Sequence, residues 1–167
     1  MSQTTIEREH AEQLPLSKAA EHLLDECRMV LPGIQALFGF QLIAVFSPGF
    51  DQKLSLSEQR LHVFALALVA VAVAIVMTPA AYHRQTRPRE ITETFIILST
   101  RLILWSMVPL AAGITIDCAL IVGLVFDGVR VVILSTTLFA VFFILWFLLP
   151  RVSALQRALG GRDTSLR

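Results

Sequence analysis

The chain has 167 residues, 55% of them hydrophobic and 16% charged, and its formal net charge at pH 7 is +1. This length leaves room for a single domain, and so high an apolar share is expected where hydrocarbon forms much of the solvent. The sequence carries neither a basic run typical of a nucleic-acid-binding surface nor a strongly acidic tail, so we do not expect nucleic acid as a ligand.

Four apolar runs account for most of the chain. Each is close to or above the roughly 18 to 20 residues that a helix needs to cross a hydrocarbon layer of about 30 Å. The sequence therefore predicts an all-α fold, an integral membrane four-helix bundle over residues 29–149. An N-terminal segment, 1–28, with an amphipathic surface helix precedes it, and a tail, 150–167, follows. The expected spans are Met29–Phe46, Leu61–Ala81, Leu102–Phe126 and Val129–Leu149.

The first 28 residues are polar and lack the basic, apolar and small-residue regions of a secretory signal. Leucines interleave there with charged residues, a pattern typical of a helix that lies along a membrane surface. We expect this helix to begin at about Leu16. Glu21 with Asp25 and His22 with Glu26 stand four residues apart, but a single histidine lacks the second ligand pair of a metal site. We therefore predict a solvated face and no metal.

Span one contains two amides within its apolar run, Gln35 and Gln41. Pro32 and Gly33, at the start of the run, predict a bend between the surface helix and the span. The glutamines are six residues apart, or about 240° around a helix, so they do not point along one line. An amide in hydrocarbon needs a partner, usually across a helix interface. Contact between helices is thus the favoured role for both, and lining a water path is the alternative.

A short connection leads to span two, which has no internal charge. Ser57 is expected to cap the helix, with Glu58 in its first turn. Pro79 marks the expected exit from the membrane, and His83 and Arg84 lie at the headgroup level, where aromatic and basic residues anchor helices. Anchoring is favoured for His83, although its charge changes near neutral pH and a proton-sensing role is open.

Arg101 stands at the ambiguous start of span three. If the helix enters lipid at Phe95, Arg101 lies about 9 Å deep, and if it enters at Leu102, Arg101 is interfacial. In both registers the long side chain reaches toward the headgroups, which removes most of the energetic penalty. The favoured interpretation is this extension, or an ion pair with Glu90, Glu93 or Glu26.

Asp117 is the better functional candidate in span three, because a carboxylate in lipid has no comparably long stem. A helix cap or a position at the outer interface is favoured for it over an ion path. Pro109 and Gly113, near the middle of the span, predict a bend that frees a backbone carbonyl, a feature that ion sites often use.

The distribution of Lys and Arg predicts the orientation. Arg101 aside, three of the 14 basic residues, Lys53, Arg60 and Arg130, fall on the side of the two short connections, and the other ten fall on the side of the termini. This bias places both termini in the cytoplasm. The ten are Arg8, Lys18, Arg28, Arg84, Arg87, Arg89, Arg151, Arg157, Arg162 and Arg167. At that interface we expect a network of Glu26, Arg28, His83, Arg84, Glu90 and Glu93.

No catalytic or cofactor site is expected. The sequence has no Walker loop, no dinucleotide glycine fingerprint, no G-x-S-x-G nucleophile and no HExxH motif. His62 and His83 lie at opposite ends of span two, so they do not form a haem-ligand pair. Cys27 and Cys118 are predicted on opposite sides of the membrane, which makes an intrachain disulfide implausible.

Several segments carry a resemblance to a known family: the run from Glu26 to Gln41, Pro48 to Phe50, Gln59 with Arg60, and MTPAAYHR at the end of span two. The chain resembles an uncharacterised family of small bacterial four-span membrane proteins. The similarity is best over 26–84 and continues more loosely to the WFLLP of span four. The resemblance implies a four-helix membrane domain in a bacterial cell (inner) membrane, and no activity or site residue.

Two functional hypotheses follow. In the first, copies of the chain form a homo-oligomer in the lipid bilayer, and Gln35, Gln41, Arg101 and Asp117 line a passage for ions or small solutes. In the second, the protein is a scaffold or regulatory module that binds an unknown protein partner through its N-terminal helix, and the intramembrane amides only join helices. The small size favours oligomerisation in both cases.

Overall fold

The structure is a computed structural model that describes residues 15–86 and 92–152. Within these residues there are no strands, and four helices are long and apolar enough to cross a membrane. The predicted all-α four-span architecture is therefore confirmed. The elements are α1 (Leu16–Val45), a short α2 (Gly49–Lys53), α3 (Leu56–Thr86), α4 (Glu93–Gly123) and α5 (Val129–Phe143), which continues into the π-helical turn Ile144–Leu148.

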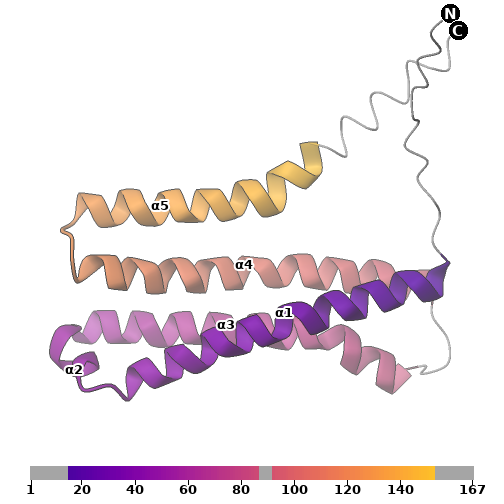
Figure 1. Ribbon diagram of the computed structural model, residues 1–167, viewed down its shortest axis with the longest axis horizontal. Helices are drawn as coiled ribbons and strands as arrows, with labels where there is room; N and C mark the ends of the chain where they lie inside the picture. Colours follow the sequence, from indigo (N-terminus) through magenta and orange to yellow (C-terminus); the bar gives the residue numbers. More distant parts are fainter. Residues whose placement is uncertain (1–14, 87–91, 153–167) are drawn as a thin grey trace, which may run out of the picture.

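Three of the long helices, α3, α4 and α5, run side by side, and α1 crosses α3 obliquely (Figure 1). The most extensive packing is between α3 and α4, α1 packs on both of them, and α5 packs chiefly on α4. The bundle has two ends. We call the end that carries residues 46–55 and 124–128 the loop end, and the opposite end, where α1 begins and α3 ends, the termini end.

The N-terminal part of α1 differs from the expectation. A single helix runs from Leu16 to Val45 with Pro32 inside it, so the predicted separate surface helix, with a bend before span one, is not confirmed. Ala20 and Leu23 are buried, which gives the first turns of α1 a packed face. That packing explains why the helix continues into the span instead of ending at the proline, which by itself costs a helix interior one backbone hydrogen bond.

Helices α3 and α4 approach closely at a glycine. On α3, Ala65, Val69 and Ala72 are fully buried. On α4, a Cβ added at Gly113 would lie 2.9 Å from Val69 Cγ2 and 3.1 Å from the Ala65 carbonyl oxygen. Small residues at such contacts let helix backbones pack tightly where lipid supplies no hydrophobic driving force. Helix α4 runs without interruption from Glu93 to Gly123 with Pro109 inside it, so the span is not divided into two helices. The bend expected at Pro109 stays a prediction, and Gly113 serves this close contact.

This contact gives a stability prediction. We expect Gly113→Ala to destabilise the protein by about 1 to 3 kcal/mol, because the new methyl group forces α3 and α4 apart. Gly123→Ala, in the same helix, is the matched control. A Cβ there meets nothing within 4 Å, and alanine is the better helix former by up to about 1 kcal/mol. Unfolding in mixed detergent measures both, and equal stabilities of the two variants would contradict the close contact.

The start of α3 corrects one prediction. The helix begins at Leu56, so Ser55 and not Ser57 stands at the N-cap position. The Glu58 carboxylate accepts a hydrogen bond from the Ser55 backbone N–H at 2.7 Å, and the Glu58 N–H donates to Ser55 Oγ at 3.4 Å. This reciprocal arrangement is a capping box. The first turn of α3 is thereby fixed at the loop end.

Candidate functional site

Three polar side chains from three helices meet inside the bundle. Gln41 of α1 is 4% exposed and His62 of α3 is 7% exposed, and the Asp117 side chain of α4 is 15% exposed. His62 Nδ1 lies 2.9 Å from Asp117 Oδ1, and His62 Nε2 lies 3.0 Å from the backbone carbonyl oxygen of Gln41. The Gln41 side-chain amide donates to Asp117 Oδ2. We call these three residues the polar cluster.

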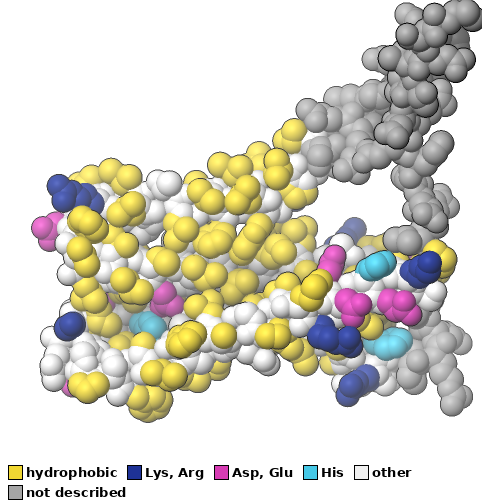
Figure 2. Space-filling view, viewed as in Figure 1, with side chains coloured by type: hydrophobic (Ala, Val, Ile, Leu, Met, Phe, Trp, Pro, Cys, Tyr) yellow, Lys and Arg dark blue, Asp and Glu magenta, His cyan; other side chains and the backbone are white. Residues whose placement is uncertain are grey.

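Antiparallel helices bring the polar cluster to one level of the bundle. Gln41 stands four residues before the end of α1 at Val45, His62 six residues after the start of α3 at Leu56, and Asp117 six residues before the end of α4 at Gly123. With a rise of about 1.5 Å per residue, all three lie within about 9 Å of the loop end of their helices. Figure 2 shows an acidic and a histidine side chain together there, away from the charged groups at the termini end.

The polar cluster is shielded on one side by an aromatic ring. Phe50, from the short helix α2, contacts the His62 imidazole edge-on, with ring centroids 5.4 Å apart and planes at 66°. This arrangement is a favoured aromatic geometry. It explains why a five-residue helix is placed between α1 and α3, since α2 covers the polar cluster at the loop end.

A cavity of about 250 Å³ borders the polar cluster. Gln41, His62 and Asp117 line it together with Cys118 and apolar residues, among them Leu37 and Ile114. Within the described part of the chain, Gln41 Oε1 is buried without a hydrogen-bond partner. A buried carbonyl oxygen of this kind is costly unless it accepts a hydrogen bond from water or a ligand. The polar cluster therefore combines two ionisable groups with a free acceptor.

The comparison with known families decides the affiliation of the chain. The profile described as Family of unknown function (DUF6328) matches residues 9–150. The chain belongs to this family. This match confirms the predicted resemblance to an uncharacterised family. No curated protein and no solved structure matches the chain significantly.

Sequence reasoning found two members of the polar cluster and missed the third. Gln41 and Asp117 stood out as polar residues within apolar runs, and the structure joins them directly. His62 was weighed only as a haem ligand and rejected. The predicted spans gave no signal for it, because they place His62 one residue from the start of span two and Asp117 nine residues from the end of span three, whereas the structure places both six residues from the loop-end termini of α3 and α4.

The other two intramembrane candidates lie apart from the polar cluster. Gln35 and Arg101 are exposed on α1 and α4, and within the described residues neither side chain has a polar partner. The suggested ion pairs of Arg101 with Glu26 or Glu93 do not form between these described residues. Glu90 lies outside the described residues. Whether Gln35 and Arg101 line a passage stays a prediction.

At the termini end, three residues of the predicted interface network lie around one cavity, and the network itself stays a prediction. Arg28, His83 and Arg84 line one cavity of about 280 Å³ together with Cys27. Arg28 pairs with Asp25 at 3.1 Å on the exposed face of α1, and the His83 ring lies 5.4 Å from that of Phe95. The ring contact agrees with an anchoring role for His83. Glu26 and Glu93 are exposed and take no part in the cavity lining, and Glu90 is again outside the described residues.

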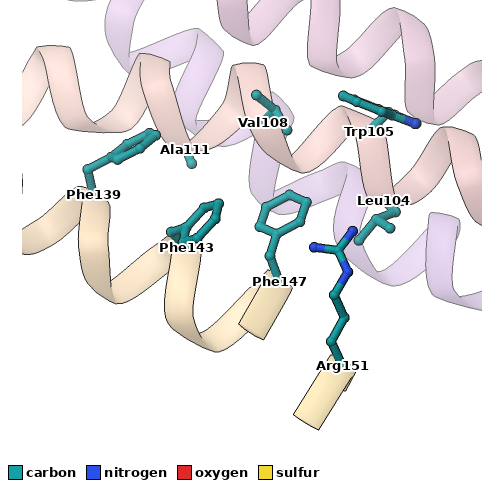
Figure 3. A pocket seen from close by; sticks show the side chains of 8 residues that line it. All are labelled: Leu104, Trp105, Val108, Ala111, Phe139, Phe143, Phe147 and Arg151. Atoms are coloured by element: carbon teal, nitrogen blue, oxygen red, sulfur yellow. The ribbon is translucent and has the colours of Figure 1, made fainter. Parts of the chain in front are cut away.

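A larger cavity, of about 350 Å³, lies between α4 and α5 (Figure 3). Phe139 and Phe143 of α5 and Phe147 beyond it face Leu104, Trp105 and Val108 of α4, and Arg151 is the charged residue of the lining. The π-helical turn Ile144–Leu148 carries Phe147. This lining offers contact surface for apolar chains and no group for acid–base chemistry besides the guanidinium of Arg151. It does not compete with the polar cluster as a chemical site.

The described residues contain neither a metal-ligand cluster nor a disulfide. Among them, no three His, Cys, Asp or Glu residues gather as metal ligands would. Both cysteines are free: Cys27 lies in the first half of α1 and Cys118 beside the polar cluster on α4. The chemistry that the polar cluster offers is hydrogen bonding and proton exchange by an imidazole and a carboxylate.

Proposed function

We propose that this protein passes ions or small solutes across a membrane as an oligomer, and that the polar cluster is its ion-handling element. One observation carries the proposal: a buried imidazole and a partly buried carboxylate lie 2.9 Å apart between helices long enough to span a bilayer. Ionisable residues at such positions are costly and mark ion paths or proton relays. The adjoining cavity gives an ion or water molecule a place to bind beside the polar cluster.

Two features of the outer faces of the bundle support an oligomer: an exposed amide without a partner among the described residues, and an apolar helix without a buried residue. Gln35 is an exposed amide in a predicted span and has no partner within the described residues, although a polar group in hydrocarbon needs one. In the apolar window of α5 no residue is buried. A neighbouring copy would supply both a partner for Gln35 and a surface for α5. An assembly about an axis normal to the membrane is the arrangement we propose.

The orientation of the chain is part of the proposal. Arg28, Arg84 and Arg151 lie at the termini end, and this excess of basic residues favours the cytoplasmic side of a bacterial inner membrane. The polar cluster then lies in the outer half of the membrane. We propose no catalytic role, because the proposed activity needs binding and release only.

Flux from proteoliposomes tests the proposal. Purified wild-type protein is reconstituted, and the release or uptake of protons, Na⁺, K⁺, Cl⁻ and glycerol is followed in parallel with empty liposomes. We expect at least one species to move faster than through empty liposomes. A rate equal to that of empty liposomes for the whole panel would contradict the proposal.

One feature favours the alternative of a scaffold that binds a protein partner. The exposed side chains of α1 near the termini end include Glu21, His22, Asp25 and Glu26, so this part of α1 presents a charged face outside the apolar part of the bundle. The alternative leaves the buried polar cluster a structural role only. It predicts no flux above that of empty liposomes, and the same assay therefore separates the two functions.

A further inference from the structure

We infer that the polar cluster is a proton-binding site in which His62 and Asp117 share one proton between Nδ1 and Oδ1. This inference deepens the proposed function, because it names the ion. The movement of this proton across the membrane rests on the proposed function. The binding of the proton is inferred from the geometry alone.

The hydrogen-bonding capacity of each atom limits where the protons of the pair can lie. His62 Nε2 lies 3.0 Å from the Gln41 carbonyl oxygen. A carbonyl oxygen only accepts, so Nε2 carries a hydrogen. His62 Nδ1 lies 2.9 Å from Asp117 Oδ1. A hydrogen bond there requires a second hydrogen, either on Nδ1 or on the carboxyl group.

Both placements of the second hydrogen give the same net charge. In one, an imidazolium faces a carboxylate, and in the other, a neutral imidazole accepts from a neutral carboxyl group. The pair is uncharged either way and contains one proton more than a neutral imidazole beside a carboxylate. Without that proton, one of the two ring contacts would lose its hydrogen, and the lone pairs of either Nδ1 and Oδ1 or Nε2 and the Gln41 carbonyl oxygen would face each other. The observed geometry is therefore that of the proton-loaded site.

Each helix packed against the pair contributes neighbouring groups. From α1, the Gln41 amide donates to the second carboxylate oxygen, and the Gln41 carbonyl near the C-terminal end of that helix accepts from the ring. A cation is stabilised at such a helix end. From α2 only the Phe50 ring contacts the imidazole. On α3, the carboxylate of Glu58 is bonded to Ser55, and on α4 Cys118 is the other titratable group that lines the cavity.

The cavity beside the pair gives a water molecule room to exchange the proton. Release transfers the shared proton to a water molecule, which becomes hydronium, and leaves a neutral imidazole beside a carboxylate with one negative charge. No bond between heavy atoms forms or breaks, so the step balances with water alone.

Magnetic resonance on the full-length protein in lipid nanodiscs tests the shared proton without reference to flux. His10, His22 and His83 are replaced by Gln, so that the signal of ¹⁵N-labelled histidine comes from His62 alone, and the carboxyl carbons of Asp are labelled with ¹³C. Asp117 is assigned by its loss in Asp117→Asn. At neutral pH we expect either a doubly protonated ring with an ionised Asp117, or a singly protonated ring with a protonated Asp117.

A singly protonated ring beside an ionised Asp117 under these conditions would overturn the inference. In Asp117→Asn we expect any doubly protonated signal to disappear, because the carboxylate that holds the second proton is gone. Elution at the wild-type volume checks that this variant is folded, and Asp127→Asn, which changes an exposed acid and leaves the polar cluster intact, is a second variant that should retain the shared proton. A shared proton without flux would leave the inference standing and refute the proposed function, and flux without a shared proton would do the reverse.

Discussion

Replacing His62 or Asp117 alone by leucine is expected to destabilise the protein by about 3 to 5 kcal/mol, and replacing both is expected to recover much of that loss. Each single variant leaves a polar partner buried beside an apolar side chain. Asp117→Leu also leaves the Gln41 amide without the carboxylate to which it donates a hydrogen bond. The double variant removes both ionisable groups at once, so that less unpaired polarity remains.

Unfolding by titration with a denaturing detergent measures all four proteins of this double-mutant cycle. Asp127→Leu is the control, since Asp127 is an exposed acid in the connection at the loop end, and surface substitutions of this kind change stability by about 0.5 kcal/mol or less. Additive effects of the two single substitutions would show that the pair is not coupled. That outcome would contradict the contact from which both proposals start.

The second large effect concerns transport. We expect proton flux through proteoliposomes to fall by about a hundredfold in Asp117→Asn, equivalent to roughly 2.7 kcal/mol at the rate-limiting step. Asparagine keeps the shape of the side chain and its contact with Gln41, but it cannot hold the negative charge that rebinds the proton. The loss should therefore appear in flux while the protein remains folded.

Asp127→Asn provides the matched control, because the same chemical change at an exposed acid leaves the polar cluster intact. Both variants are reconstituted at equal protein-to-lipid ratios and driven by the same potential. Wild-type flux in Asp117→Asn would mean that protons pass elsewhere or that the flux is not carried by protons. Equal losses in the two variants would point to a general effect of surface charge.

The fold could be predicted from the sequence to a large extent. Span length and composition alone give four helices, because a bilayer imposes a minimum length on every apolar crossing. The exact ends of the helices were harder to predict. Pro32 was read as the boundary between a surface helix and span one, but the burial of Ala20 and Leu23 makes α1 continuous. Local propensity could not reveal this packing, which depends on neighbouring helices.

The site could be predicted only in part, and for a related reason. Gln41 and Asp117 are conspicuous within apolar runs, so the sequence singles them out. His62 stands at the polar edge of its span and has no unusual neighbour in sequence. Its role comes from contacts 55 residues away with Asp117 and 21 residues away with Gln41. Such contacts depend on how three helices are aligned, which single-helix periodicity does not specify.

The close packing at Gly113 could likewise not be predicted from the pattern of a single helix. Beside Pro109, this glycine suggested a broken helix and an exposed carbonyl. In the structure it admits the backbone of α3, and α4 stays helical throughout. A glycine in a membrane helix has both uses, and only the partner helix decides between them.

Single-particle imaging of the protein in lipid nanodiscs tests most directly whether the polar cluster is an ion-handling site within an assembly. We expect several copies around an axis normal to the membrane, with a continuous water-filled opening that reaches the cavity beside Gln41, His62 and Asp117. A monomer would contradict the proposal. So would a ring whose axis is filled by apolar side chains and lipid, with the polar cluster sealed from water on every side.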